Sequence, residues 1–377
     1  MKPQTFEYES INRSNRIAWI DTAKGIAMIL VFYGHLGGSG DNPWFPGLTG
    51  SIWVVYLFHM PLFFMLSGLT FNPHKDFRTF LVARCKRLVI PYFFFSIYAL
   101  GKILLLIVAP SVVKGFHGRS MGNPMTEFIN ILLGNTTGLW FFLALFWGDL
   151  ALYGLHKLTV HSSCRILVLS LIFVASGLVW FVMNFFGVYE YAPFQLLRAT
   201  EAIAFVGIGW LISSRLKTLS KRESVFLLGI TFVAFIGVGC LIHYLEIYNV
   251  EWWGVVTAIP CLFAAICGSL MTMAIAQLVP AWRWVTYIGR NTMVFYGLNG
   301  LSMAISRKII FILISVSLVA SQLVLQIIIG LVVVAGACLI CAAATLVLNR
   351  WCWWGIGLPN PHKRCYSAKH ATRQTVE

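Results

Sequence analysis

Charged residues are scarce in this chain. They make up 11% of its 377 positions, whereas a soluble protein of this size carries about a quarter. Hydrophobic residues make up 59%, and no hydrophilic stretch is long enough to form a separate domain. This composition excludes an ordinary soluble enzyme. It predicts an all-α, polytopic integral membrane protein built around one membrane domain.

Several common catalytic signatures are also missing. The chain contains no P-loop, no dinucleotide-binding fingerprint, no G-x-S-x-G and no H-E-x-x-H. Cys338 and Cys341 form a C-x-x-C, but no second pair or histidine cluster stands near them, so buried thiols are favoured over a metal site. We therefore predict no metal centre and no bound cofactor. The N-terminal region lacks a small-residue cleavage pattern, which argues against a removable signal peptide.

The apolar stretches and the basic residues together predict a topology. Ten stretches approach the about 20 residues that a bilayer crossing needs. Most of the 28 Lys and Arg residues fall on one side of these spans, and the positive-inside bias then places both termini in the cytoplasm. The net charge of +15 therefore reflects topology, and no nucleic-acid partner is predicted. The predicted spans are 17–36, 52–70, 88–109, 139–156, 166–187, 198–214, 224–244, 254–279, 288–306 and 324–348.

Outside these spans the chain has a polar N-terminal tail, residues 1–16, and a basic C-terminal tail, residues 351–377, both predicted to be cytoplasmic. Residues 303–323 are less regular, because Arg307 and Lys308 interrupt an apolar run that is too short to span alone. We expect a re-entrant or broken segment there. The compact basic loops suit a bacterial inner membrane.

The first predicted span, IDTAKGIAMILVFYGH, carries three ionisable residues. Lys24 and His35 are eleven residues apart, almost three helical turns, so both project from one face roughly 16 Å apart. Asp21 is close enough to pair with Lys24. Intramembrane ionisable groups usually line a pathway or a reaction site. The alternative is an Asp–Lys pair that fixes helix packing, with an interfacial histidine.

The second predicted span adds His59, followed by Pro61. Proline removes a backbone donor, so a kink is expected here. A short loop joins the first two spans, which makes them antiparallel neighbours and allows His35 and His59 to share a cavity. A neutral imidazole accepts a proton near neutral pH, which suits general-base work on a hydroxyl. An interhelical hydrogen bond is the alternative role for His59.

Three basic residues, Arg84, Lys86 and Arg87, stand at the predicted cytoplasmic end of the third span. Such a cluster fits the topology rule without any further role. It also suits the phosphates of a nucleotide-like donor, which Arg and Lys neutralise and hydrogen-bond. Both interpretations remain open at this point.

These motifs, taken together and in this order, resemble the acyltransferase-3 family of membrane O-acyltransferases, and specifically its fucose 4-O-acetylase-like branch. The resemblance covers about residues 16–350 and defines a single acyltransferase-3-like membrane domain over residues 17–350. It rests on D-x-x-K-G with the later histidine (Asp21, Lys24, Gly25, His35), FHMPLFF-x-x-SG (58–68), R-x-x-R-L-x-x-PY (84–92), LWFF-x-x-L (139–145) and IGRNT (288–292).

The resemblance implies an acyl-CoA donor, usually acetyl-CoA, used from the cytoplasmic side. It implies a carbohydrate acceptor, either a surface polysaccharide or a lipid-linked glycan. His35 matches the essential histidine, and Lys24 stands where most members have arginine. Arg84 and Arg87 match the basic motif thought to face the donor. Asn299 stands where many relatives have a histidine, so that position receives no catalytic role.

The resulting hypothesis is O-acyl transfer across the membrane. His35, helped by His59, deprotonates a sugar hydroxyl that attacks the thioester, while Asp21 and Lys24 position the acyl group or stabilise charge. A covalent acyl-histidine relay is also open. The competing class is a transporter or flippase for a glycan or small polar substrate, which would leave the ester content of the glycan unchanged. A non-catalytic scaffold or sensor leaves the histidine motifs unexplained.

Overall fold

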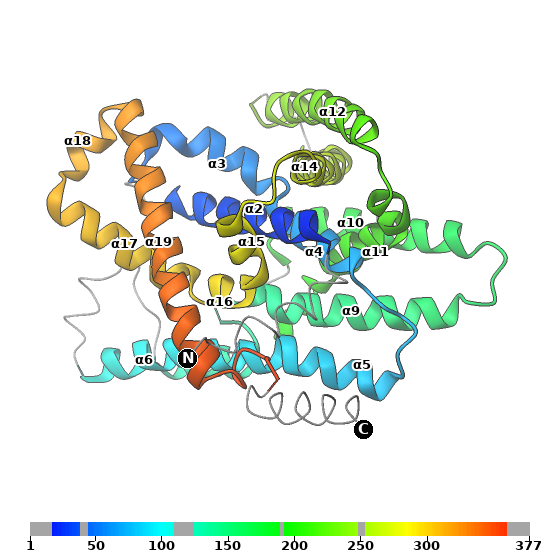
Figure 1. Ribbon diagram of the computed structural model, residues 1–377, viewed down its shortest axis with the longest axis horizontal. Coiled ribbons are helices and arrows are strands. Elements are labelled where there is room, and N and C mark those ends of the chain that lie inside the picture. Colours follow the sequence, from blue (N-terminus) through cyan, green and yellow to red (C-terminus); the bar gives the residue numbers. More distant parts are fainter. Residues whose placement is uncertain are drawn as a thin grey trace, which may run out of the picture.

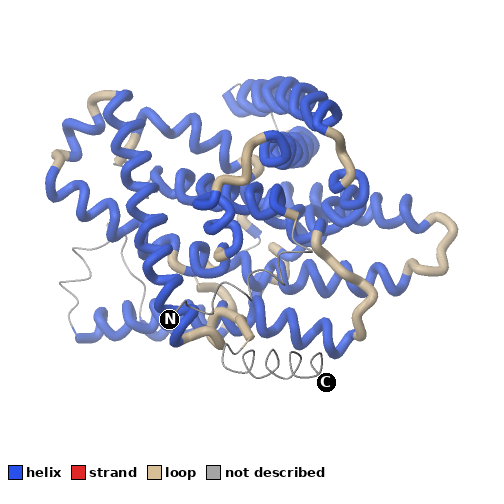
Figure 2. Tube along the Cα trace, viewed as in Figure 1, coloured by secondary structure: helices blue, strands red, loops and turns tan. Residues whose placement is uncertain are grey.

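The computed structural model describes residues 17–37, 44–108, 124–136, 138–188, 192–247 and 253–359. These residues fold into helices joined mainly by short connections (Figure 1), and none of them forms a strand (Figure 2). In a hydrocarbon environment a helix satisfies its backbone polar groups within one segment, which explains this outcome for so apolar a chain. The predicted all-α class is confirmed.

The longer helices, in chain order, have the following bounds: α2 Ala18–Gly34, α3 Thr49–Tyr56, α4 His59–Leu69, α5 Phe77–Arg84, α6 Ile90–Val108, α8 Pro124–Leu132, α9 Trp140–Leu158, α10 Arg165–Phe185, α11 Ala199–Lys217, α12 Lys221–Ile247, α14 Ala258–Leu278, α15 Arg283–Arg290, α17 Asn299–Leu313 and α19 Leu323–Trp351. The shorter elements are α13 Trp253–Val256, α16 Thr292–Gly297, α18 Val316–Ala320, the 3₁₀ turns η1 His35–Gly37, η2 Pro46–Leu48 and η5 Pro193–Gln195, and the π-helical turn η3 Cys85–Val89.

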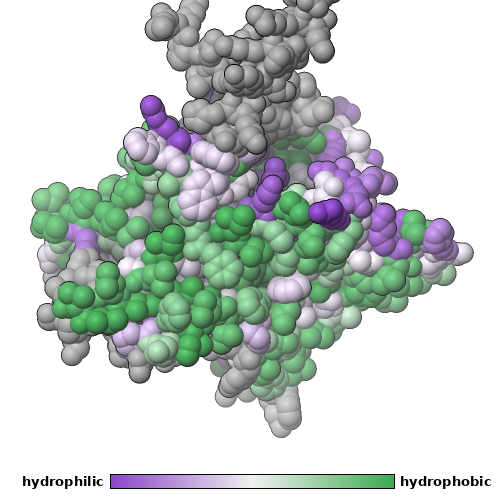
Figure 3. Space-filling model, turned by 90° about the horizontal axis from the view of Figure 1, so that it is seen from below, coloured by the Kyte–Doolittle hydropathy of each residue, from purple (hydrophilic) through white to green (hydrophobic). Residues whose placement is uncertain are grey.

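Six helical segments among the described residues are long and apolar enough to cross a membrane: Pro46–Leu69, Arg165–Phe185, Pro193–Lys217, Lys221–Ile247, Ala258–Leu278 and Leu323–Trp351. Helical residues occur in all ten predicted stretches, but ten crossings and cytoplasmic termini remain predictions. Large apolar side chains are widely exposed on the outer helices, α12 and α19 included. Figure 3 shows one face of the molecule, on which hydrophobic side chains cover a broad area and hydrophilic side chains gather to one side, as a bilayer-embedded surface requires.

The second predicted span is interrupted where the sequence places a proline. Helix α3 ends at Tyr56, and Phe58 has the non-helical angles φ −142° and ψ −14° before α4 begins at His59. Pro61 occupies the first turn of α4, where its missing N–H has no intrahelical partner to lose. A proline ring clashes with the carbonyl four residues earlier, here that of Leu57, which explains the position of the break.

The ninth predicted span is divided into three helices, α15, α16 and α17. Asn291 and Leu298 separate them as non-helical residues. Beyond them, α17 ends at Leu313 and the short helix α18 precedes α19. Residues 303–323 therefore form a broken helical segment, in agreement with one of the two forms expected for them.

Helix α2 lies at the centre of the molecule (Figure 1) and packs against α4, α14, α15, α16 and α19. The contact with α15 requires two glycines. A Cβ on Gly25 would clash with the carbonyl oxygen of Val285, and a Cβ on Gly289 would clash with that of Asp21. Small residues allow helix backbones to approach closely in membranes. This approach brings the IGRNT motif against the first motif of the chain.

Candidate functional site

The charged end of α2 is paired with α15. The Nε atom of Arg290 donates a hydrogen bond to Oδ2 of Asp21 over 3.1 Å. The Asp21 side chain is 14% exposed and that of Arg290 is 36% exposed, so the pair lies at a partly accessible edge of the helix contact. Lys24 is half-buried one turn further along α2. Its pairing with Asp21 remains a prediction, whereas Arg290 is a partner that the sequence did not indicate.

The other end of α2 meets the helix break beside α4. The hydroxyl of Tyr56 donates to the carbonyl oxygen of Gly34 at 3.4 Å, and the Tyr56 ring stands edge-on to the His59 ring with centroids 4.9 Å apart. His35 follows Gly34 directly and interacts electrostatically with His59. The structure thus places the two histidines near each other, with Tyr56 linking their helices. A shared cavity remains a prediction.

His59 is held in one orientation by the break. Its side chain is 6% exposed, and Nδ1 lies 3.0 Å from the carbonyl oxygen of Val55. A carbonyl only accepts hydrogen bonds, so Nδ1 carries the proton in this contact. In the neutral ring the second nitrogen, Nε2, then keeps its lone pair. His59 is therefore built as a hydrogen-bond acceptor, or a base, at Nε2.

His35 differs from His59 in being exposed. It begins the 3₁₀ turn η1 at the end of α2, where its backbone N–H satisfies the last helix carbonyls. Arg307 of α17 interacts electrostatically with it, and the Arg307 guanidinium lies 6.0 Å from the ring centroid of Trp44. The exposed imidazole is accessible to an incoming hydroxyl. The neighbouring cation stabilises the oxyanion that forms when the hydroxyl loses its proton, while it disfavours a positive charge on the imidazole itself.

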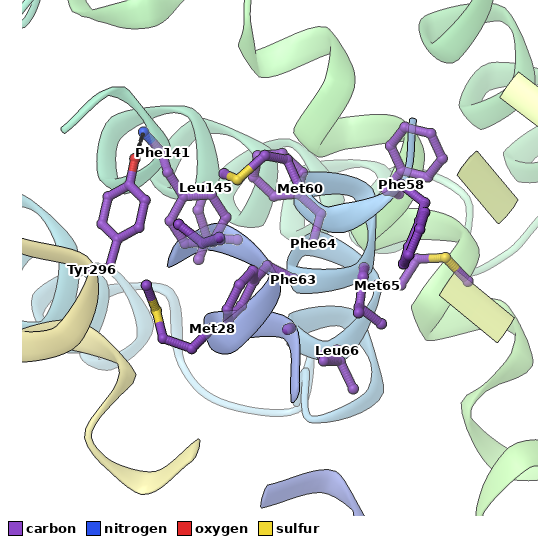
Figure 4. Close-up of a cluster of buried hydrophobic side chains, with 14 of the residues drawn as sticks. Met28, Phe58, Met60, Phe63, Phe64, Met65, Leu66, Phe141, Leu145 and Tyr296 are labelled. Carbon is purple, nitrogen blue, oxygen red and sulfur yellow. Dashed lines mark hydrogen bonds between the residues drawn. The ribbon is translucent and has the colours of Figure 1, made fainter. Parts of the chain in front are cut away.

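A cluster of buried aromatic and other apolar side chains fills the region between the two ends of α2. Met28 of α2, Phe63 and Phe64 of α4, and Phe141 of α9 lie among its buried side chains (Figure 4). Phe64 and Phe141 have ring centroids 4.9 Å apart. The hydroxyl of Tyr296 accepts a hydrogen bond from the backbone N–H of Phe141 at 3.3 Å, drawn as the dashed line in Figure 4. This packing separates the Asp21 end from the His35 end with apolar side chains.

Arg84 forms an ion pair with the buried side chain of Asp149. Its Nε atom lies 3.1 Å from Oδ2 of Asp149, whose side chain is fully buried, and the Arg84 side chain is only 19% exposed. The guanidinium also lies 5.1 Å from the ring centroid of Phe80. A buried carboxylate requires a counter-ion, so this ion pair gives Arg84 a structural role. Whether Arg84 also contacts a donor stays a prediction.

Lys86 and Arg87 lie in the π-helical turn η3 and are exposed. Arg84, in contrast, points inward to Asp149. The backbone of this turn packs closely against Gly357, near the C-terminal end of the described chain. Gly357 has φ +69°, and a Cβ there would clash with the Lys86 carbonyl. The three residues are thus neighbours in sequence with different environments.

A second buried polar group was not identified as a site. The carboxylate of Glu201 is 4% exposed, and its Oε2 atom has no hydrogen-bond partner among the described residues. Arg198 interacts with it electrostatically, and the Arg198 guanidinium stacks over Trp140 at 4.5 Å. Tyr296 interacts with both charges. Arg198 and Glu201 are three residues apart on one helix face, and Trp140 belongs to the LWFF motif. Their proximity to Tyr296 depends on how the helices pack.

One pocket, with a volume of about 430 Å³, lies between α6 and α19. Its lining is apolar and includes Phe94, Tyr98 and Val347. It contains none of the predicted site residues. The predicted site residues therefore lie outside this apolar pocket.

The two ring nitrogens of His59 have different environments, so one substitution can distinguish a catalytic role from a structural role. In His59→Asn, the amide nitrogen can replace Nδ1 as donor to Val55, but nothing replaces Nε2. We expect a chain that folds normally and transfers acyl groups more than tenfold slower. Thermal unfolding of the purified chain and initial transfer rates give the two readouts. His59→Gln is the matched variant, since its amide reaches the Nε2 position instead. Native rates in His59→Asn would leave His59 only the interhelical hydrogen bond.

Comparisons with known proteins agree with the motif order. The sequence matches the acyltransferase-3 family, described as an acyltransferase domain, over residues 17–343. The chain is also similar to the nodulation protein NolL of Sinorhizobium fredii (strain NBRC 101917 / NGR234), with 30% identity over 145 residues, 36% of this chain and 37% of that protein. The alignment thus spans just over a third of this curated relative. No solved structure matches. The match over most of its length shows that the chain belongs to the acyltransferase-3 family and carries an acyltransferase domain over residues 17–343.

Proposed function

We propose that this chain transfers an acyl group, in the first instance acetyl, from acyl-CoA to a hydroxyl of a surface polysaccharide or lipid-linked glycan. The finer placement in the fucose 4-O-acetylase-like branch belongs to the same proposal, and so does the bacterial inner membrane as location. Family membership supports the acyl transfer. The donor and acceptor come from the motif resemblance and from the arrangement of polar groups along α2.

The observation that carries the proposal is the pairing of an exposed histidine with an oriented one. His35 is accessible at the end of α2, and His59 keeps Nε2 free because Val55 occupies Nδ1. A purely structural imidazole pair does not require either feature. Both suit proton removal from an alcohol.

The proposed step balances as follows. An imidazole nitrogen of His35 removes the proton of the sugar hydroxyl, and the hydroxyl oxygen attacks the thioester carbonyl carbon. The carbon–sulfur bond breaks, the new ester remains on the sugar, and the CoA thiolate leaves and takes up a proton. His59 Nε2 accepts a hydrogen bond or proton beside His35. Lys24, with Asp21 held by Arg290, offers positive charge along the same helix.

The test is the ester content of surface glycans. Cells that express the chain are compared with cells that carry an empty vector, and base-labile acetate is measured on their purified glycans. We expect acetate to rise with the chain and to be labelled when the acetyl-CoA pool is labelled. The label separates donor use from a change in glycan amount.

A transporter would produce the opposite pattern. Glycan export or uptake would change, while the acetate per sugar would stay constant. An unchanged ester ratio in cells that make the acceptor glycan would therefore contradict the proposed acceptor class.

A further inference from the structure

A cationic cluster lies at the end of α9, away from the two histidines of the proposed reaction. We call it the α9-end cluster, and it consists of His74, His156, Lys157 and Arg165. The His74 and His156 rings have centroids 6.2 Å apart. The guanidinium of Arg165 lies 5.5 Å from the ring centroid of Trp210, and His156 lies 5.4 Å from the same ring. Three separate segments thus deliver positive or protonatable groups to one place.

His156 gives this cluster an unsatisfied interior. It is 8% exposed, and its Nδ1 atom has no hydrogen-bond partner among the described residues. Its electrostatic neighbours are Arg165, Lys157 and His74, all of them cationic or able to become so. A buried polar atom without a partner costs free energy. An anion bound here would accept a hydrogen bond from His156 and offset the mutual repulsion of its neighbours.

No carboxylate neutralises the cluster within the described ranges. The ion pairs found there join Arg84 to Asp149, Arg215 to Glu223 and Arg290 to Asp21. The acidic residue closest in sequence, Asp76, instead caps α5 by accepting a hydrogen bond from the backbone N–H of Thr79 at 3.2 Å. The cluster therefore retains its positive charge for an external anion.

A line of contacts connects the cluster to the motif predicted to face the donor. Lys157 lies 5.6 Å from the ring centroid of Tyr153, and Tyr153 stacks on Phe80 at 4.7 Å. The Arg84 guanidinium in turn lies over the ring of Phe80. Along α9, His156 follows Asp149 by two helical turns, about 10 Å. The charge pattern of the loops assigns this end of α9 to the cytoplasm.

We propose that the α9-end cluster binds phosphate, and that its ligand is the phosphate-bearing nucleotide end of the CoA donor. This assignment rests on the proposed function. It moves the donor's phosphates from Arg84, Lys86 and Arg87, where the motif resemblance placed them, to residues at the end of α9, the start of α10 and the loop before α5. Several phosphates of one molecule match several cations spread over one end of a helix. Tyr153 and Phe80 then mark the direction from the phosphates toward Arg84.

The experiment measures CoA binding to the full chain in nanodiscs of zwitterionic lipid, by calorimetry. The variant is Lys157→Gln/Arg165→Gln, since Lys157 is exposed and Arg165 half-exposed, so the fold should tolerate the change. The matched control is Lys221→Gln/Arg222→Gln, which removes the same charge from exposed positions of α12. We expect the Kd for CoA to rise at least tenfold in the first variant and less than threefold in the control. His156→Gln should also weaken binding.

The other outcomes separate this inference from the proposed function. Native-like CoA affinity in the cluster variant would overturn the α9-end site and leave the donor assignment standing. Equal weakening in both charge variants would show a general charge effect and also overturn the site. No CoA binding by the native chain would contradict the donor itself. A phosphate could also come from lipid, so phosphatidylglycerol retention is measured by mass spectrometry. A loss confined to that lipid would overturn CoA as the ligand.

Discussion

His35→Ala is expected to slow acyl transfer by about 10²–10⁴-fold, the usual contribution of a positioned general base. The fold should be preserved, because the side chain is exposed at the end of α2 and surface substitutions typically change the free energy of unfolding by less than about 0.5 kcal/mol. The measurement is the initial rate of label transfer from acetyl-CoA to a glycan acceptor by the purified chain in nanodiscs.

His161→Ala is the matched control, since His161 is an exposed histidine in the α9–α10 connection without a proposed role. It should keep the native rate. A His35→Ala chain that retains more than a tenth of the native rate would remove His35 from the chemistry. The role of base would then pass to His59, whose Nε2 atom is already oriented.

Arg84→Ala is expected to cost the most stability of any single change considered. It leaves the fully buried carboxylate of Asp149 without its counter-ion, and breaking a buried ion pair by removing one partner costs about 3–5 kcal/mol. Proteins have only about 5–15 kcal/mol of stability in total. We expect a sharp fall in folded yield, measured by size-exclusion chromatography in detergent and by thermal unfolding.

The double variant Arg84→Met/Asp149→Leu should recover folded yield, because well-packed apolar residues often replace a buried pair at no cost. Lys86→Ala is the control, as its exposed side chain should change yield little. If the double variant remains as unstable as Arg84→Ala, the loss of the ion pair does not explain the loss of stability in Arg84→Ala. If it folds and transfers acyl groups at the native rate, Arg84 has no contact with the donor that matters.

The helices themselves were largely predictable. Apolar runs of the right length gave helical segments in every expected stretch, and Pro61 located the break that divides the second one. Hydrophobic length and proline geometry act locally, so sequence reports them well. The three-part division of residues 288–306 was not anticipated, since Asn291 and Leu298 are not strong helix breakers on their own.

The site was predictable in its residues and less so in its partners. Asp21, His35 and His59 were identified from the need of polar groups inside a membrane. Their observed contacts involve Arg290, Tyr56 and Val55, of which Arg290 lies 269 positions from Asp21 in sequence. Helical spacing suggested Lys24 for Asp21 because it describes one helix only. A partner on another helix depends on how the two pack.

The sequence by itself determined that this chain is an all-helical membrane protein of the acyltransferase-3 type, because composition, length and motif order are properties of the linear chain. The tertiary structure decided which charged side chains form structural contacts inside the protein. It turned Arg84 inward to Asp149, fixed the free nitrogen of His59 and gathered His74, His156, Lys157 and Arg165 at one end of α9. Electrostatic energy depends on distance and burial between segments, and those are set only when the helices pack.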